Sequence, residues 1–134
     1  MPEFVNITYM AKSNVKILIV EDDPTLLEMY SIKLEQEGLA FLTATDGEEG
    51  LELALAENPS VILLDIMMPK MDGFAVLSEL KKNPATKDTP ILMLSNLGQK
   101  DDVAKGKKLG ATDYVIKASM TPTQVVEKIK SYIK

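Results

Sequence analysis

Short apolar runs alternate with segments of helical spacing along most of the chain. Five such runs lie at Ile17–Val20, Leu39–Leu42, Val61–Leu64, Ile91–Leu94 and Tyr114–Ile116. Four of the five are nearly continuous rather than alternating with polar residues, which is typical of strands covered on both faces. The pattern predicts five buried strands, each followed by a helix.

The segments between the runs begin with helix start signals. The expected caps are Asp23 before Pro24, Asp46 with Glu49, Asp72, and Thr121 before Pro122 with Gln124. The faces expected to point inward carry Leu27, Tyr30 and Leu34; Leu51, Ala54 and Leu55; Phe74, Leu77 and Leu80; and Val125, Val126, Ile129, Tyr132 and Ile133. The fourth helix, roughly 100–109, has the weakest pattern, because a glycine such as Gly106 costs about 1 kcal/mol relative to alanine inside a helix. We expect it to be the most labile helix.

Strands and helices that alternate five times imply right-handed crossovers and a parallel sheet with helices on both faces. We therefore predict one α/β domain over residues 15–134. Residues 1–14 carry no clear period and are set aside as an N-terminal extension or an expression remnant, with Met10 as an alternative start. In such folds the site lies at the carboxyl ends of the strands, near a switch in strand order.

Composition removes several kinds of chemistry. The chain has no cysteine and no histidine, so it offers no zinc–thiolate site, thiol nucleophile or imidazole base. The net charge of −5 gives no support to a nucleic-acid binder, whose surface is basic. No apolar run approaches the roughly 20 residues that a membrane span needs, and neither a signal peptide nor a span is found, so we expect a cytoplasmic protein.

Polar residues follow four of the predicted strands. They are Glu21, Asp22 and Asp23 after the first strand, Asp65 after the third, Ser95 and Asn96 after the fourth, and Lys117 after the fifth. Taken singly, most have plain explanations: Asp23 as a helix cap, Ser95 as part of a turn, Lys117 as a surface lysine. Chance would scatter these residues, whereas here they meet at one edge of the predicted sheet.

Grouped carboxylates need either a proton or a cation. Two of them about 4 Å apart repel by about 4 kcal/mol at an effective dielectric constant of 20. With only oxygen ligands available, the cation should be Mg²⁺, or Mn²⁺ in its place. The hydroxyl of Ser95 and the ammonium of Lys117 suit the oxygens of a phosphoryl group, which leaves Asp65 as a possible nucleophile.

Four motifs, ILIVEDDPTLLEMY, VILLDIMMPKMDG, PILMLSN and GATDYVIKA, resemble in this order the receiver domain of two-component response regulators. The resemblance covers nearly all of residues 16–134. It implies a flavodoxin-like fold with five helices and strand order 2-1-3-4-5. It also implies Mg²⁺-dependent phosphorylation of one aspartate by a phosphohistidine on a sensor histidine kinase or a His-containing phosphotransfer protein.

The resemblance also implies a role for each site residue. Asp65 matches the phosphoacceptor, Ser95 the switch hydroxyl, Lys117 the phosphate-binding lysine and Tyr114 the switch aromatic. The metal ligands implied are Glu21, Asp22, Asp65 and the backbone carbonyl of Met67, with Glu21 acting mostly through water.

Three positions bear on how the site differs from the family pattern. Ala118 replaces the usual cis-proline after the lysine, so we expect a trans bond and a differently shaped loop. Asn96 is bulkier than the residue common there and should narrow access to the phosphate. Met67 is apolar and cannot orient a water, so we predict slow self-dephosphorylation.

The same resemblance implies a two-state switch. Phosphorylation would draw Ser95 toward Asp65, Tyr114 would fill the vacated space, and the surface made by the fourth helix, fifth strand and fifth helix would change and bind a downstream protein. Lysines on that surface fit an acidic partner about as well as they fit a solvated helix. The chain would then be a stand-alone regulator or a receiver excised from a larger protein, without direct nucleic-acid contact or membrane insertion.

Two other classes of function compete with this interpretation. A receiver-fold scaffold would bind partners without being phosphorylated, which the intact set of site residues disfavours. A Mg²⁺-dependent aspartyl phosphatase would turn over phosphoesters, but such enzymes usually place a second acid where Met67 stands. We therefore expect no enzyme beyond self-phosphorylation from phosphohistidine or small phosphodonors.

Overall fold

The computed structural model describes residues 16–96 and 100–133. Strands and helices alternate throughout, in the order β1 (Ile17–Val20), α2 (Pro24–Gln36), β2 (Phe41–Ala44), α3 (Gly47–Glu57), β3 (Val61–Asp65), α4 (Gly73–Lys82), β4 (Ile91–Ser95), α5 (Lys100–Leu109), β5 (Asp113–Ile116) and α6 (Pro122–Lys130). None of the helices in these two ranges is both long and apolar enough to cross a membrane. The extension expected over residues 1–14 lies outside the described residues.

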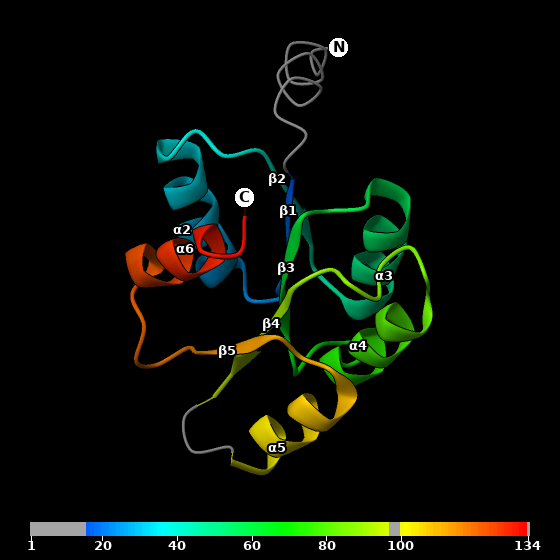
Figure 1. Cartoon of the computed structure of the whole chain (residues 1–134). Helices are drawn as coiled ribbons and strands as arrows, with labels where there is room; N and C mark the ends of the chain where they lie inside the picture. Colours follow the sequence, from blue (N-terminus) through cyan, green and yellow to red (C-terminus); the bar gives the residue numbers. More distant parts are fainter. Residues whose placement is uncertain (1–15, 97–99, 134) are drawn as a thin grey trace.

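The five strands form one parallel sheet in the order β2-β1-β3-β4-β5. Helices α2 and α6 lie on one side of it and α3 and α4 on the other, with α5 next to α4 (Figure 1). The α/β class, the strand order and the five helices predicted from the sequence are therefore confirmed. The order reverses between β1 and β3, which places a crevice at their carboxyl ends.

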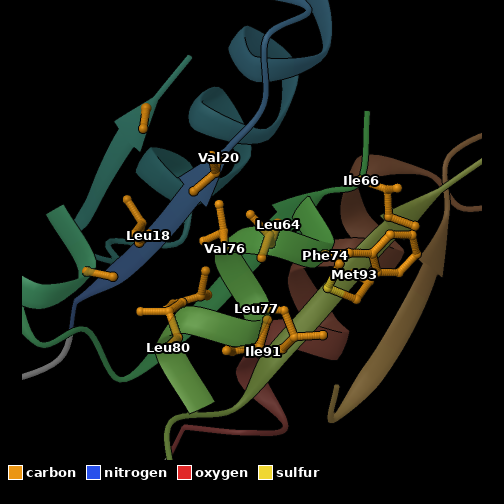
Figure 2. Packing of buried hydrophobic residues seen from close by; sticks show 13 residues of the cluster. Leu18, Val20, Leu64, Ile66, Phe74, Val76, Leu77, Leu80, Ile91 and Met93 are labelled. Atoms are coloured by element: carbon orange, nitrogen blue, oxygen red, sulfur yellow. The ribbon is translucent and has the colours of Figure 1, made fainter. Parts of the chain in front are cut away.

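Alternate side chains of each strand enter two separate cores. Leu18, Val20 and Leu64 face the core beneath α3 and α4, together with Phe74 and Leu77 of α4 (Figure 2). The alternate positions, which include Ile17, Ile19, Val61 and Leu63, face the core beneath α2 and α6. Such two-sided burial explains why the strands read as continuous apolar runs.

The same alternation decides where the strand-end residues point, because successive side chains of a strand lie on opposite faces. Glu21, Asp65 and Lys117 continue the positions of Ile19, Leu63 and Val115, all in the core beneath α2 and α6. Ser95 instead continues the positions of Ile91 and Met93, in the opposite core. The sheet thus brings two carboxylates and one ammonium to the same side.

Strand β2 begins two residues later than the sequence pattern predicts. Gly38 adopts a left-handed φ of 72° after α2, and the N–H of Leu39 donates to the carbonyl of Leu34 at 3.0 Å, while that of Gly38 donates to Glu35 at 3.0 Å. This is a Schellman motif, in which the apolar residue after the glycine packs back on the helix. Leu39 therefore belongs to the end of the helix rather than to the strand.

Two details of α3 also differ from the prediction. Leu55 is 43% exposed, because small residues, including Gly50 and Ala54, form the buried face of this helix. A Cβ on Gly50 would lie 2.7 Å from Cγ1 of Val20, so a larger residue would push the helix off the sheet. Asp46 caps α3, but the side chain of Glu49 accepts from the N–H of Thr45, so only half of the expected capping box forms.

Candidate functional site

One lysine bridges two buried carboxylates at the carboxyl ends of β1, β3 and β5. The ammonium of Lys117 lies 3.0 Å from Oδ2 of Asp65 and 3.2 Å from Oε1 of Glu21. Glu21 is 0% exposed and Asp65 is 2% exposed. The group therefore carries one more negative charge than positive charge in a place that water scarcely reaches.

The turn after β1 fixes Glu21 in place. The backbone N–H of Asp23 donates to Oε2 of Glu21 at 2.9 Å, and the Asp23 side chain in turn caps α2 by accepting from Thr25 and Leu26. The prediction that Asp23 is a helix cap is confirmed. Asp22, between them, is exposed, so its carboxylate faces the mouth of the site.

The loop after Asp65 is packed tightly against the start of α4. The N–H of Gly73 donates to the carbonyl of Ile66 at 2.8 Å, and a Cβ at Gly73 would collide with the carbonyl of Asp65. Lys70 takes a left-handed φ of 67°, which is uncommon for a residue other than glycine. These constraints hold Asp65 rigidly at the end of its strand.

Burial and the charges of their neighbours shift the pKa values of all three groups. Desolvation raises the pKa of Glu21 to about 7; the N–H of Asp23 opposes the rise, while the charge of Asp65 adds to it. Burial also raises the pKa of Asp65, although Lys117 offsets part of the effect. Burial alone would lower the pKa of Lys117, but the two carboxylates outweigh it and raise that pKa. The cluster is thus short of positive charge.

A hard cation fits this shortage. Glu21, Asp22 and Asp65 each offer a carboxylate oxygen, and these oxygens lie within 4.8 Å of one another. An all-oxygen set with two buried members and one exposed member suits Mg²⁺, which keeps several of its waters. The structure thus brings the three predicted carboxylate ligands together, and the role of the Met67 carbonyl stays a prediction.

A cavity of about 140 Å³ opens beside Asp65. It is lined by Asp65, Ile66, Met67, Leu94, Asn96 and Asp102. Asn96 thus lines the cavity beside Asp65, and its narrowing of the access to a phosphoryl group stays a prediction. Asp102 was not expected there, because its position depends on how α5 packs against the sheet, and no local motif records that packing.

The hydroxyls of the two predicted switch residues donate to backbone carbonyls rather than to Asp65. The hydroxyl of Ser95 donates to the carbonyl of Asn96 at 3.1 Å. The hydroxyl of Tyr114 donates to the carbonyl of Asp102 at 3.0 Å, and a Cβ at Gly106 would collide with that hydroxyl. Gly106 therefore makes room for Tyr114, a role that the sequence pattern, which showed only its cost to the helix, did not reveal.

The loop that follows Lys117 contains no cis peptide bond among the described residues. The N–H groups of Ser119 and Met120 both donate to the carbonyl of Ile116, at 3.1 and 3.2 Å. The trans bond predicted before Ala118 is confirmed, and a short turn leads to α6. There Thr121 and Gln124 form the expected capping box.

Comparison with known proteins agrees with this fold. Residues 17–130 match the family described as the response regulator receiver domain. This chain belongs to that family.

Several relatives are transcriptional regulators. The chain is 44% identical over 102 residues to the DNA-binding dual master transcriptional regulator RpaA of Synechocystis, a match that covers 76% of this chain and 42% of RpaA. It is 40% identical over 119 residues to the probable transcriptional regulator ycf27 of Guillardia theta, covering 89% of this chain and 45% of that protein. The chain therefore spans about half the length of the curated relatives it matches.

Among solved structures, the chemotaxis protein CheY4 of Vibrio cholerae superposes with a TM-score of 0.81 at 31% identity. The match covers 89% of this chain and 98% of that one. The architecture of this chain is therefore that of a CheY-like receiver.

Proposed function

We propose that the chain is a phosphorylatable switch that accepts a phosphoryl group on Asp65. A carboxylate oxygen of Asp65 attacks phosphorus and the bond from phosphorus to the donor nitrogen breaks, its electron pair going to that nitrogen. The histidine leaves as neutral imidazole because its other ring nitrogen has taken a proton from solvent. The donor class, a histidine kinase or a phosphotransfer protein, follows from the family. The observation that carries the proposal is a buried aspartate that shares one lysine with a second buried carboxylate.

The surrounding residues have separate tasks in this transfer. Glu21, Asp22, Asp65 and the Met67 carbonyl would hold Mg²⁺, or Mn²⁺ in its place, which supplies charge neutralisation at the transferring group. The ammonium of Lys117, already 3.0 Å from Asp65, is placed to pair with a phosphoryl oxygen. Ser95 would exchange its bond to the Asn96 carbonyl for one to the phosphoryl group.

The output surface consists of α5, β5 and α6. A move of Ser95 opens space on the sheet face where Tyr114 packs, and Tyr114 is hydrogen-bonded to the first turn of α5. Phosphorylation would therefore act on α5 and change what this surface binds. We propose that a target protein binds to this surface. We also propose that the chain acts in the cytoplasm and does not insert into a membrane.

Direct DNA contact is not part of the proposal, because the net charge of −5 opposes it. The relative RpaA is itself named as DNA-binding, but the chain covers less than half of that protein.

We also propose that the phosphoryl group is lost slowly and that the chain does not turn over substrates. Met67 is 68% exposed and lines the cavity beside Asp65, so an apolar side chain occupies the approach that an attacking water would take. A phosphoryl lifetime of only seconds at neutral pH, measured by the decay of the phosphorylated mass, would contradict slow loss.

The direct test is the intact mass of the protein after incubation with acetyl phosphate, with Mg²⁺ or with EDTA. We expect one added phosphoryl group that requires both Mg²⁺ and Asp65. The variant Asp65→Asn should gain nothing, whereas the matched control Asp113→Asn should be modified like the wild type. No gain in the wild type would favour the binding scaffold, and sustained release of phosphate would favour the phosphatase.

A further inference from the structure

Tyr30 carries a buried hydroxyl that the protein does not satisfy. The residue lies in α2 and is 1% exposed, within the core beneath α2 and α6. In the part of the chain that the structure describes, its hydroxyl has no hydrogen-bond partner. Phenylalanine would fill the same space without leaving a polar group unpaired, so the hydroxyl calls for a reason.

The unsatisfied atoms of the described residues all belong to side chains on one side of the sheet. Buried side-chain oxygens without a hydrogen bond are the Tyr30 hydroxyl, Oε1 of Glu21 and Oδ2 of Asp65. The two carboxylate oxygens contact Lys117 as ion pairs, which leaves the tyrosine with nothing. All three side chains lie on the α2 and α6 side of the sheet.

The negative charges of Glu21 and Asp65 both act on the hydroxyl of Tyr30. Burial raises the pKa of Tyr30 to about 12, and the charge of Glu21 and then that of Asp65 add to the rise. The hydroxyl is therefore fully protonated at neutral pH and acts as a donor. Carboxylates are the strongest acceptors that it can find in this core.

Filling the site changes what Glu21 has as partners. One ammonium now serves both carboxylates, and the remaining oxygen of Glu21 is held by the N–H of Asp23. If Lys117 turned to a phosphoryl group on Asp65, Oε1 of Glu21 would exchange its ion pair with the ammonium for the metal ion and the water that it carries. A carboxylate that serves a metal ion in this way is usually held in its orientation by a further hydrogen bond from a residue outside the ligand set.

We propose that Tyr30 is a positioning residue whose hydroxyl donates to Glu21 when the site holds its metal ion. The inference rests on the proposed function of Asp65. The Tyr30 hydroxyl of α2 would thus be a hydrogen-bond donor that has no partner in the metal-free site and gains one when the metal ion binds. Tyr30 touches neither the phosphoryl group nor the donor and acts only through Glu21.

The experiment compares Tyr30→Phe with a matched control, Tyr132→Phe. The hydroxyl of Tyr132 donates to Oδ2 of Asp113 at 2.6 Å, so the same one-atom deletion there removes a satisfied hydrogen bond. Urea unfolding of the metal-free proteins gives the stability of each, and titration calorimetry with MgCl₂ gives the affinity. Phosphorylation by acetyl phosphate is then followed at low and at saturating Mg²⁺.

We expect the two variants to behave in opposite ways. Tyr30→Phe should keep or raise the urea midpoint, weaken Mg²⁺ binding roughly tenfold or more, and slow phosphorylation at low Mg²⁺ with recovery at saturation. Tyr132→Phe should lower the urea midpoint and leave the Mg²⁺ affinity within about twofold of the wild type. A purely structural role of Tyr30 would not lower the Mg²⁺ affinity while it left the urea midpoint unchanged or raised.

The inference is overturned if Tyr30→Phe binds Mg²⁺ as the wild type does, or if it lowers stability as Tyr132→Phe does with no change in affinity. It is also overturned if the wild type binds no Mg²⁺. Its failure is distinct from that of the proposed function. A wild type whose Mg²⁺ affinity depends on Tyr30 but which gains no phosphoryl group would retain the positioning role and reject Asp65 as a phosphoacceptor.

Discussion

Two groups of carboxylate, lysine and tyrosine lie in different parts of this small domain. In the group around Asp65, Lys117 pairs with both Glu21 and Asp65, and the hydroxyl of Tyr30 on the same side of the sheet has no hydrogen-bond partner among the described residues. At the beginning of β5, a single carboxylate, Asp113, accepts from Lys128 at 3.1 Å, from the Tyr132 hydroxyl at 2.6 Å and from the N–H of Tyr114 at 2.7 Å.

The pKa values of the carboxyl groups are shifted in opposite directions in the two groups. Burial would raise the pKa of Asp113, but its bonds to Tyr132, the Tyr114 N–H and Lys128 outweigh burial and lower it. Burial instead prevails at Asp65 and at Glu21, whose pKa values are raised. The Asp113 group is complete in itself and fastens α6 to β5. The Asp65 group lacks one cation, which a bound metal ion would supply.

The largest expected difference comes from removing each lysine. Lys117→Met leaves two buried carboxylates without a counter-ion, and breaking such a pair costs about 3 kcal/mol or more of unfolding free energy. Lys128→Met removes a partly exposed pair and should cost about 1 kcal/mol or less. Urea unfolding at pH 8 without metal measures both, and added Mg²⁺ should recover part of the loss in Lys117→Met alone. Equal losses in the two variants would remove the contrast between the groups.

A smaller effect is expected in the pH dependence of the metal-free domain. Glu21 has a folded pKa raised to about 7 from 4.5, so its contribution to stability is complete below about pH 4.5 and is lost as the pH rises through 7. Linkage over that window lowers the unfolding free energy by about 1–3 kcal/mol. Asp113 has a lowered pKa, so its contribution is present above its usual value of 3.8 and is lost only as the pH falls below that.

Urea unfolding from pH 3 to 8 tests whether Glu21 and Asp113 contribute to the pH dependence of stability in these opposite directions. The wild type should be most stable near pH 4–5, and Glu21→Gln should flatten the fall toward neutral pH. Asp113→Asn should alter only the acid limb. A wild-type curve that rises steadily from pH 5 to 7 would contradict the assignment of Glu21 as the carboxylate that resists ionisation.

The sequence was sufficient for those parts of the structure that depend on local order. Continuous apolar runs located the strands, and the polar residues placed directly after them, such as Glu21, Asp65 and Lys117, had to meet because parallel strands end at one edge. Leu39 was wrongly assigned to the second strand. An apolar residue at this position can either follow the glycine that ends a helix or begin a strand. Local pattern alone could not separate them.

Contacts between distant segments could not be predicted in this way. Tyr114 rests on Gly106, Asp102 lines the cavity beside Asp65, and Tyr30 lies near Glu21. Each of these depends on the rotation of a helix about its own axis relative to the sheet. In the sequence, Tyr30 was one apolar-stripe residue among several, and only its unpaired hydroxyl in the folded domain distinguishes it.

The central claim is that the incomplete group, and not the complete one, binds the cation. The most direct measurement is a titration of the isotope-labelled, full-length chain with MgCl₂ at pH 7.5, followed by amide chemical shifts. The account predicts saturable shifts at Glu21, Asp22, Asp65 and Met67, with Asp113 and Tyr132 unmoved. Shifts that are spread over all exposed carboxylates, or that centre on Asp113, would contradict it.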